Sequence, residues 1–570
     1  MSMEVSGPPW VVRIRGGVPV SYDPLDGQMY ANGSPVSGAG DGKTSPNSII
    51  MIGDSITNNN SSSNGLVGAA NFTRQFKTLD IGWWTWTNII LGGAFKVIRN
   101  SGRSGDTTGD MLSRLAADVL AYSPAWVLVA GGINDRQLGG QADLGYDYTV
   151  NNLQTIVERC TAAGVKVLLA TILPNNAVNA LGAGNIKVEN LLRVNDWIRR
   201  YCEGKSNVIC LDVFSSVHDQ TTLCDGVAGT FNPPTDKTHP LVAPCWRIGT
   251  DAARVLSGVV KPRPVIASLG GIASATNPYG NLVKYPTMSG TGGTMPGVYT
   301  STLAAVAITG TAGQFSCTAT SLVVGQAITV SGTLSGTGGI AGYSSPTTYY
   351  IIATNGSTTF TLSATQGGSA ITTTAGTTVG WTFAVNGSVP DGWWLQNDGA
   401  AVANAGHTIV HTRPARTDYP NLTWWQATVN WTASQNVVTV FTHRLLSGSV
   451  LTIPAGISAG DLIDCAIELE YSSVTNAGPL TVEFVARQGT TDLTFTDGQF
   501  DAGNTYSAGL VSGQTATTPT PAFAGIVTAN GMPLPAGCDN IMVRVQARNL
   551  AGTVGGYTLR IGRVFVGKRL

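Results

Sequence analysis

The sequence has 570 residues, more than one hydrophobic core supports, so we expect several domains. Lys plus Arg and Asp plus Glu both number 33, and this balance argues against a general nucleic-acid binder or a protein that binds anionic membranes through charge. No apolar stretch is long enough to span a bilayer, and the first residues lack the pattern of a signal peptide. We therefore expect no membrane insertion and no signal peptide.

Residues 1–45 are predicted to form an N-terminal arm. Trp10–Ile14 is its strand candidate, and the rest is rich in turn-forming pairs such as Asn32-Gly33. Such an arm is suited to packing on the next domain or to attaching the chain to a larger particle.

Residues 46–262 alternate between strand and helix signals. The strand candidates are Ile49–Gly53, Phe95–Asn100, Trp126–Ala130, Val165–Ala170 and Val208–Val213. The helix candidates lie near Ile81–Leu91, Thr107–Ala121, Tyr148–Ala163 and Ile186–Cys202, and a last helix follows Pro244 with Ile248, Ala252, Val255 and Leu256 on one side. This alternation predicts a parallel sheet covered by helices on both faces. We expect Trp83, Trp84 and Trp86 to pack in its core.

Four motifs with polar residues lie next to these predicted strands and helices. Gly53-Asp54-Ser55 ends the first strand, a Gly-rich block with Ser104-Gly105-Asp106 follows the second, and Asn134 follows the third. Asp236-Lys237-Thr238-His239 precedes the last helix. Since sites of open α/β sheets lie at the carboxyl ends of strands, Ser55 stands where a nucleophile is expected. The alternative is that Ser55 only caps the next helix.

A serine nucleophile needs a base, and the segment holds two histidines. His239 is the favoured base, because Asp236 lies three residues before it and can bind its other ring nitrogen across one turn. His218 with Asp219 is the alternative pair. Ser55 has no G-x-S-x-G surroundings, which argues against an α/β-hydrolase.

The four motifs together resemble those of the SGNH (GDSL-like) hydrolases over residues 46–262. The resemblance implies a three-layer, flavodoxin-like α/β fold, with Ser55 as nucleophile, His239 as base and Asp236 as its orienting carboxylate. It also implies an oxyanion hole made by the Ser55 N–H, Gly105 and Asn134. Gly102 is a second glycine of the same block, and the S-G-D-T register favours Gly105.

Four charged residues near these motifs have less definite roles. Arg103 and Arg136 flank the oxyanion blocks and are candidates for substrate binding, with surface ion pairing as the alternative. Asp54 and Asp135 are expected to brace their own loops.

The cysteines show no metal-binding or redox spacing. All 8 are scattered, and we expect mostly free, buried thiols. Cys224 and Cys245 flank the fourth motif and are the pair to check for a disulfide. No metal-ligand constellation appears, so we expect no metal and no cofactor.

Beyond residue 262 the sequence predicts β structure. Residues 263–305 form a linker and a first strand, 306–385 an inserted small β module, and 386–570 the remainder of a β-sandwich that spans about 277–570. The module's strand candidates are Ala307–Gly310, Gln326–Val330, Thr348–Ile352 and Thr359–Leu362. The sandwich's later candidates are Leu422–Val429, Asn436–Phe441, Asp464–Tyr471, Leu480–Arg487, Asn540–Ala547 and Tyr557–Val566.

Three segments of this part carry further resemblances. Residues 324–383 resemble small β modules of bacteriophage tail proteins, and the segments from Asn281 to Gly293 and from Asp391 to Leu395 resemble strands of a carbohydrate-binding-like sandwich. Trp393, Trp394, Trp424 and Trp425 are candidates for a sugar-stacking surface, although alternation along a strand predicts that one of each pair is core.

The expected function combines these parts. We expect a serine esterase of a phage tail spike or tail fibre, which removes acyl groups, above all O-acetyl groups, from bacterial surface polysaccharide. Expected partners are that polysaccharide, other tail proteins and two further copies of the chain in a homotrimer, and the expected location is the virion tail after synthesis in the host cytoplasm. The alternatives are a secreted bacterial lipase or esterase and a catalytically silent adhesion protein.

Overall fold

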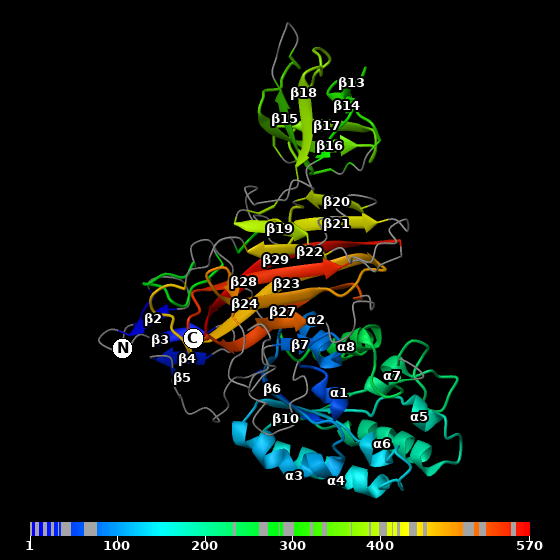
Figure 1. The fold of residues 1–570 in the computed structure, drawn as a ribbon. Coiled ribbons are helices and arrows are strands. Elements are labelled where there is room, and N and C mark those ends of the chain that lie inside the picture. The colour runs from blue at the N-terminus through cyan, green and yellow to red at the C-terminus, as the bar shows by residue number, and fades with distance from the viewer. Residues whose placement is uncertain are drawn as a thin grey trace.

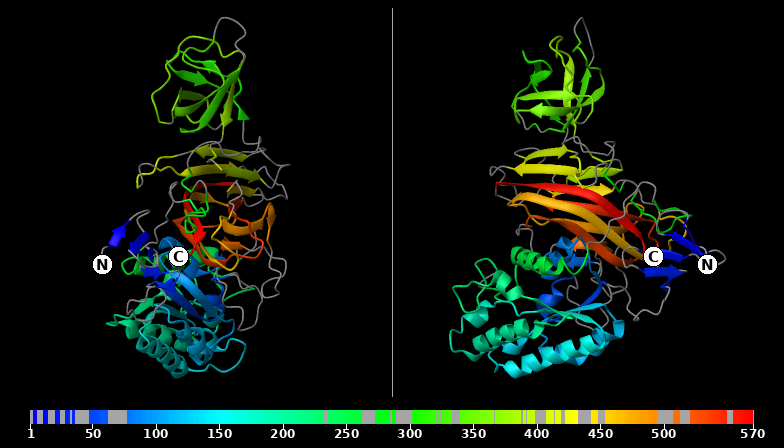
Figure 2. Two further views of the ribbon diagram at one scale, coloured as in Figure 1. Left: turned by 90° about the vertical axis from the view of Figure 1, so that its left-hand side faces the viewer. Right: turned by 180° about the vertical axis from the view of Figure 1, so that it is seen from behind.

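The computed structural model describes residues 47–61, 77–231 and 235–261, the greater part of 272–288, 301–397, 407–431 and 442–569, and the backbone of short strands between residues 3 and 35. Figure 1 shows an α/β part at one end, a β-sandwich in the middle and a small β module at the other end. The same order is seen from two further sides in Figure 2.

The N-terminal segment contains more strands than the arm prediction allowed. Its strands form one antiparallel sheet in chain order: β1 (Met3–Val5), β2 (Val11–Ile14), β3 (Val20–Asp23), β4 (Gln28–Ala31) and β5 (Ser34–Pro35). The predicted strand Trp10–Ile14 corresponds to β2, and the turn-forming pair Asn32-Gly33 lies outside the described residues.

The sheet of the α/β part is parallel, as predicted. Its strands are β6 (Ser48–Gly53), β8 (Lys96–Gly102), β9 (Trp126–Ala130), β10 (Lys166–Ala170) and β11 (Val208–Leu211). Their order is β11-β10-β9-β6-β8, which is the flavodoxin-like order 2-1-3-4-5 when counted from the β8 edge. β6 lies inside the sheet and is buried throughout. The chain leaves β6 for β8 on one side and then crosses to β9 on the other, which opens a crevice at the end of β6.

Helices cover this sheet on both faces. They are α1 (Ser55–Asn58), α2 (Trp83–Ile90), α3 (Thr108–Asp118), α4 (Tyr146–Ala162), α5 (Asn176–Asn179), α6 (Ile186–Cys202), α7 (Val213–Val217) and α8 (Val242–Leu256), with 3-10 turns at Leu120–Tyr122 and Asn134–Arg136. In Figure 1, α3, α4 and α6 lie on one side, and α2 and α8 lie between the sheet and the sandwich.

Two details of α8 differ from the prediction. The helix begins at Val242, and Pro244 sits in its first turn, where a missing N–H leaves no bond unmade. Val255 is 50% exposed, because it lies at the edge of the buried arc formed by Ile248, Ala252 and Leu256.

Two sheets form the sandwich, and their strands pair antiparallel except for the edge strand β7. One has the order β19 (Trp393–Asn397), β22 (Thr442–Ser447), β28 (Asn540–Arg548), β24 (Thr481–Gln488), β26 (Ser507–Val511) and β7 (Lys77–Leu79), and β25 (Thr491–Asp492) also pairs with β24. The other has the order β20 (His407–Thr412), β21 (Trp425–Trp431), β29 (Gly555–Lys568), β23 (Leu462–Thr475) and β27 (Phe523–Pro533). The C-terminal strand is thus an interior strand of its sheet.

The predicted first strand of the sandwich is not a strand where the structure describes it. Residues 281–283 instead run against the end of β29, where the Leu282 N–H donates to the carbonyl of Val566. The Asn281 side chain also binds there, donating to the Val564 carbonyl and accepting from the Val566 N–H. Side-chain bonding of this kind competes with a regular ladder. Residues 286–287 form a turn, and the Pro286 carbonyl accepts from the Val564 N–H. The remainder of that prediction, and the predicted strand Asn436–Phe441, lie outside the described residues.

The α/β part and the sandwich are not separate units, contrary to the predicted boundary at residue 262. β7, from the α/β segment, extends a sandwich sheet by pairing in parallel with β26. At the same junction Trp86 of α2 meets Phe523 of β27, with ring centroids 5.2 Å apart and in an edge-on arrangement. Buried residues from both parts form one hydrophobic cluster. A periodicity argument could not reveal β7, because three residues are too few to show a pattern.

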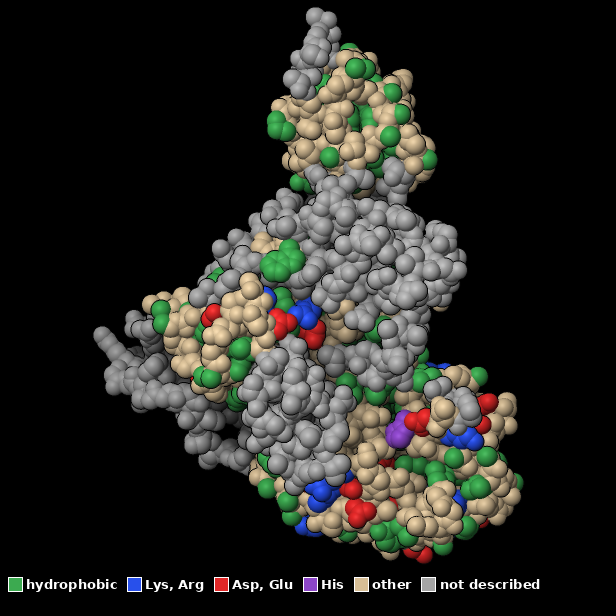
Figure 3. Space-filling view, in the orientation of Figure 1, with side chains coloured by type: hydrophobic (Ala, Val, Ile, Leu, Met, Phe, Trp, Pro, Cys, Tyr) green, Lys and Arg blue, Asp and Glu red, His purple; other side chains and the backbone are tan. Residues whose placement is uncertain are grey.

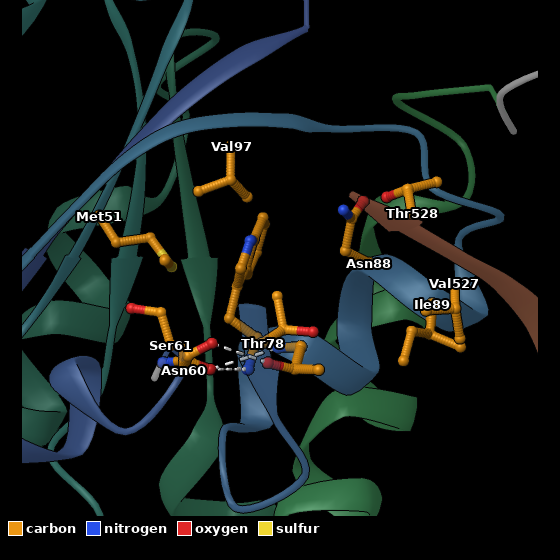
Figure 4. A pocket seen from close by; sticks show the side chains of 11 residues that line it. Met51, Asn60, Ser61, Thr78, Asn88, Ile89, Val97, Val527 and Thr528 are labelled. Carbon is orange, nitrogen blue, oxygen red and sulfur yellow. Dashed lines mark hydrogen bonds between the residues drawn. The ribbon is translucent and has the colours of Figure 1, made fainter. Parts of the chain in front are cut away.

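A small cavity of about 30 Å³ lies in this junction. Figure 4 shows Val527 and Thr528 of β27 on the side of Ile89 and Asn88 of α2, with Met51 and Val97 of the parallel sheet across the cavity. The cavity therefore lies where the sheet, α2 and the sandwich meet.

The inserted module has a sheet of its own, with the order β12 (Ser301–Thr302), β18 (Trp381–Asn386), β15 (Ala327–Gly332), β16 (Thr347–Thr354), β17 (Thr359–Ser363), β14 (Gln314–Ser316) and β13 (Ala307–Ile308). Because β12 pairs with β18, the module begins at residue 301 rather than 306. No Asp, Glu, Lys or Arg occurs in residues 285–390. Figure 3 accordingly shows apolar and neutral side chains on the module's visible face.

The aromatic and cysteine predictions can be compared with burial. Trp83, Trp84 and Trp86 are buried in the core, as predicted. Trp393 and Trp425 are also buried, whereas Trp394 and Trp424 are partly exposed. Trp394 lies in β19 of one sheet, and Trp424 directly precedes β21 of the other. The four therefore do not form one sugar-stacking surface.

All 8 cysteines are free thiols, so Cys224 and Cys245 are not bonded.

Candidate active site

Ser55 is the first residue of α1, directly after β6 and Asp54. The N-cap of this short helix is Asp54, whose Oδ1 accepts a hydrogen bond from the Ile56 N–H at 2.9 Å. The Ser55 hydroxyl is therefore not the helix cap, and its Oγ lies 2.7 Å from Nε2 of His239. The turn from strand to helix thus presents this hydroxyl to the imidazole.

Asp236 holds the other side of the imidazole. Its Oδ2 lies 2.8 Å from Nδ1 of His239, and its Oδ1 accepts from the N–H groups of Thr238 and His239, each at 2.9 Å. Burial alone would raise the pKa of Asp236, but these hydrogen bonds prevail and the pKa lies below its usual range. Since an ionised carboxylate only accepts, Nδ1 carries the ring proton and Nε2 is left to accept from Ser55.

Gly105 and Asn134 line the same cleft as Ser55. Gly105 has φ +87°, a backbone conformation that favours glycine. Asn134 donates one hydrogen of its side-chain amide to the Asp106 carbonyl at 2.9 Å, which fixes the amide and leaves its second hydrogen. The other glycine of that block, Gly102, donates its N–H to Oδ1 of Asn100 at 2.9 Å. The geometry thus favours Gly105 over Gly102 as a donor to a ligand in the cleft.

Two buried carboxylates, those of Asp135 and Asp54, hold the loops of the site in place. Asp135 is fully buried and accepts from the N–H of Thr108 and the hydroxyls of Thr108 and Thr149, which ties the third motif to the start of α3 and to α4. Burial raises the pKa of Asp54 to about 6, a rise opposed by the N–H groups of Ile56 and Thr57 and by His239. Asp54 and Asp135 therefore stabilise their own loops through hydrogen bonds, as we predicted from the sequence.

The prediction that Arg136 contacts substrate is wrong. Arg136 is 0% exposed, and its guanidinium binds the Thr149 hydroxyl at 2.7 Å and Oδ2 of Asp143 at 3.3 Å. Its carboxylate partner Asp143 lies in the segment after the 3-10 turn, a contact that sequence spacing does not reveal. The other candidate, Arg103, is partly exposed and binds Oδ2 of Asp118 at 3.0 Å, so it makes an ion pair.

The alternative base His218 lies elsewhere. Its Nε2 is 3.2 Å from the Thr222 carbonyl, and its ring packs on Phe214 with centroids 4.5 Å apart. The residues lining the cleft with Ser55 include His239 and not His218.

The cleft itself has a volume of about 960 Å³ and is open to solvent. Its lining is mainly polar, with Ile81, Leu138, Pro240 and Leu241 as apolar contributors. Several lining residues were not singled out as site residues by the sequence analysis. Among them are Asn59, one helical turn after Ser55, and Lys237, between the two triad residues of the fourth motif. The i, i+4 spacing from Ser55 was the signal for Asn59.

No metal site and no membrane-spanning helix are found in the described part of the chain. No group of three or more His, Cys, Asp or Glu side chains there is arranged to hold a metal ion. None of its helices is long and apolar enough to cross a bilayer.

Comparison with known proteins places residues 51–241 in a family. They match the model of the GDSL-like Lipase/Acylhydrolase family. Similar solved structures include the lipase/acylhydrolase from Enterococcus faecalis (22% identity, 38% of this chain and 98% of that chain, TM-score 0.29), and Axe2, an acetylxylan esterase from Geobacillus stearothermophilus (20% identity, 37% and 94%, TM-score 0.29). No curated protein matches the chain. Residues 51–241 are thus a GDSL-like lipase/acylhydrolase domain, followed in this chain by all-β sheets.

Proposed function

We propose that the chain is a serine esterase, and that Ser55, His239 and Asp236 carry the reaction. The observation that supports this most directly is the continuous chain of contacts from Asp236 through His239 to the Ser55 hydroxyl, 2.8 and 2.7 Å long, at an open cleft. This arrangement provides a nucleophile, a base and a group that orients the base.

The reaction proceeds through an acyl-serine. Ser55 Oγ attacks the ester carbonyl carbon while Nε2 of His239 takes the hydroxyl proton, and the carbonyl oxygen becomes an oxyanion. The N–H groups of Ser55 and Gly105 and the Asn134 amide stabilise that oxyanion. The ester C–O bond then breaks, and the leaving alkoxide takes the proton from His239. Water attacks the acyl-serine in the same way, giving the free acid and Ser55.

We propose that the substrate is an O-acyl group, above all an O-acetyl group, on bacterial surface polysaccharide. The cleft is wide, open and mainly polar, which suits a hydrated polymer that carries a short acyl group. A lipase needs an apolar surface for a long acyl chain, and the minority of apolar lining residues offers only a small one. Ester hydrolysis of lipids is therefore the weaker alternative, and a silent adhesion protein is the other.

We further propose that the esterase works in a phage tail spike or fibre, as a homotrimer beside other tail proteins. The support is the resemblance of residues 324–383 to tail modules and the long β-rich, uncharged segment between residues 285 and 390. Light scattering of the purified full chain tests the trimer, and a monomer at micromolar concentration would contradict it.

Acetate release tests the proposed chemistry. Purified full chain is incubated with O-acetylated surface polysaccharides and, separately, with an aryl acetate. Ser55→Ala should lose activity on the order of 10³-fold or more on both, as expected for loss of a triad nucleophile. The matched control is Ser104→Ala, which removes another hydroxyl from the cleft lining and should keep activity. If the chain cleaves the aryl acetate but releases no acetate from any of the polysaccharides, the polysaccharide substrate is refuted. If it acts on neither substrate, the adhesion protein is favoured.

A further inference from the structure

We propose that Arg114 is a positioning residue that aligns the oxyanion-hole donors with Ser55. The inference rests on the proposed function. Arg114 lies in α3, behind the site, and is 8% exposed. Its guanidinium is therefore out of reach of a substrate in the cleft and acts on the site only through the groups that it binds.

The guanidinium first fixes the ends of two neighbouring strands. Its Nη2 donates to the Gly53 carbonyl at 3.0 Å, and its Nη1 donates to the Ser101 carbonyl at 2.6 Å. Gly53 is the last residue of β6, two positions before Ser55, and Ser101 lies near the end of β8. Arg114 thus holds the backbone from which Ser55 projects against the strand that leads to the Gly105 loop.

The same guanidinium also fixes the loop that carries the other donors. Its Nε donates to Oδ2 of Asp106 at 2.6 Å. The Asp106 N–H donates to the Arg103 carbonyl at 3.2 Å, which closes the turn around Gly105, and the Asp106 carbonyl accepts from the Asn134 amide at 2.9 Å. Asp106 therefore connects Gly105 with Asn134, and Arg114 connects Asp106 with the strand end that precedes Ser55.

Only a guanidinium can make this set of contacts. Nη1 also binds Oδ2 of Asp118 at 2.8 Å, so three nitrogens in one plane serve four acceptors. A lysine at this position keeps the positive charge but places one nitrogen where three are required. Since oxyanion stabilisation depends on donors held at the right place before the reaction, such a loss affects the transition state more than substrate binding.

Arg99 provides a matched control within the same cluster. It is also buried and binds Oδ1 of Asp118 at 2.8 Å and the Ser101 hydroxyl at 2.7 Å. Arg99 binds Asp118, the Ser101 hydroxyl and the Tyr122 hydroxyl. Arg114 instead binds the carbonyls of Gly53 and Ser101 and the Asp106 carboxylate. Arg99→Lys and Arg114→Lys both remove a buried guanidinium from Asp118. Only Arg114→Lys also removes the contacts that hold the oxyanion-hole donors in place.

The experiment measures kcat and KM of the full chain on an aryl acetate. Arg114→Lys should lower kcat on the order of 10²-fold, similar to the loss of one oxyanion donor, with KM nearly unchanged. A boronic acid that mimics the tetrahedral state should bind more weakly by a similar factor. Arg99→Lys should stay within a few-fold of the wild type in both measurements. Equal kcat losses in the two variants, or a change confined to KM, would overturn the inference.

Asp106→Asn tests the same connection if Arg114→Lys does not fold. This variant keeps the bonds of Arg114 to Gly53 and Ser101 and weakens the link to the loop. It should also lower kcat rather than KM, and unchanged kcat would overturn the inference. A wild-type chain without ester hydrolysis would instead refute the proposed function itself, and the inference with it.

Discussion

Replacing Asp54 by asparagine should stabilise the α/β part at neutral pH. Asp54 is 2% exposed, and burial raises its pKa from 3.8 to about 6 despite the hydrogen bond from the Ile56 N–H and the attraction of His239; the nearby Asp135 raises it further. Asparagine has nearly the same shape and is an equally good N-cap, so its side-chain oxygen can still accept from Ile56. The substitution therefore removes a buried charge and keeps the helix cap.

The magnitude follows from the pKa shift. Between pH 4 and 6 the folded chain keeps a proton on Asp54 that the unfolded chain releases, so the free energy of unfolding falls as the pH rises through this window. A shift of about two pKa units corresponds to about 3 kcal/mol. Asp54→Asn should thus be about as stable as the wild type below pH 4, and up to about 3 kcal/mol more stable above pH 6.

Urea unfolding followed by tryptophan fluorescence measures this difference, because Trp83, Trp84 and Trp86 of α2 are buried in the α/β part. The difference in unfolding free energy is compared at several pH values between 3.5 and 7.5. Asp110→Asn is a control of opposite sign, since hydrogen bonds from Thr107 lower the pKa of Asp110. Two results would contradict this prediction: a difference in unfolding free energy that does not change with pH, or an Asp54→Asn variant that is less stable than the wild type at pH 7.5. Either result would show that burial of the Asp54 charge does not destabilise the folded chain.

Three further predictions concern stability and specificity. Phe523→Ala, which removes the ring against Trp86, should destabilise the α/β part and the sandwich together by about 3 kcal/mol, and two separate calorimetric transitions would contradict the shared core. Arg136→Met should leave KM for an aryl acetate unchanged while lowering stability, and a KM raised many-fold would return this residue to substrate binding. Hydrogen-exchange protection in the module of residues 301–386, corrected for intrinsic rates, should not vary between pH 4 and 8, because it has no Asp, Glu, Lys, Arg or His to titrate.

The parallel sheet could be predicted because its strands are mostly short apolar runs that alternate with segments of clear helical periodicity. The meeting of the motifs in space could then be predicted, because the carboxyl ends of parallel strands lie at one edge of the sheet. The structure brings Ser55, Asp236, His239, Gly105 and Asn134 to that edge, although they span 185 residues of sequence.

Other features depend on contacts that no local pattern encodes. β7 belongs to the sandwich because it pairs with β26, more than 400 residues away, and its three residues carry no periodic signal. Arg114 resembles any arginine of an amphipathic helix until its four acceptors are seen. Arg136 follows a catalytic motif, yet its burial with Asp143 removes it from the cleft.

Covalent labelling of Ser55 tests the central claim most directly. A fluorophosphonate reacts with a serine hydroxyl that a neighbouring base activates, and intact mass spectrometry counts the adducts on the full chain. We predict one adduct per chain on the peptide that contains Ser55, none in Ser55→Ala, and strongly reduced labelling in His239→Ala. No adduct on the wild type, or an adduct that persists in Ser55→Ala, would contradict a serine esterase built on Ser55, His239 and Asp236.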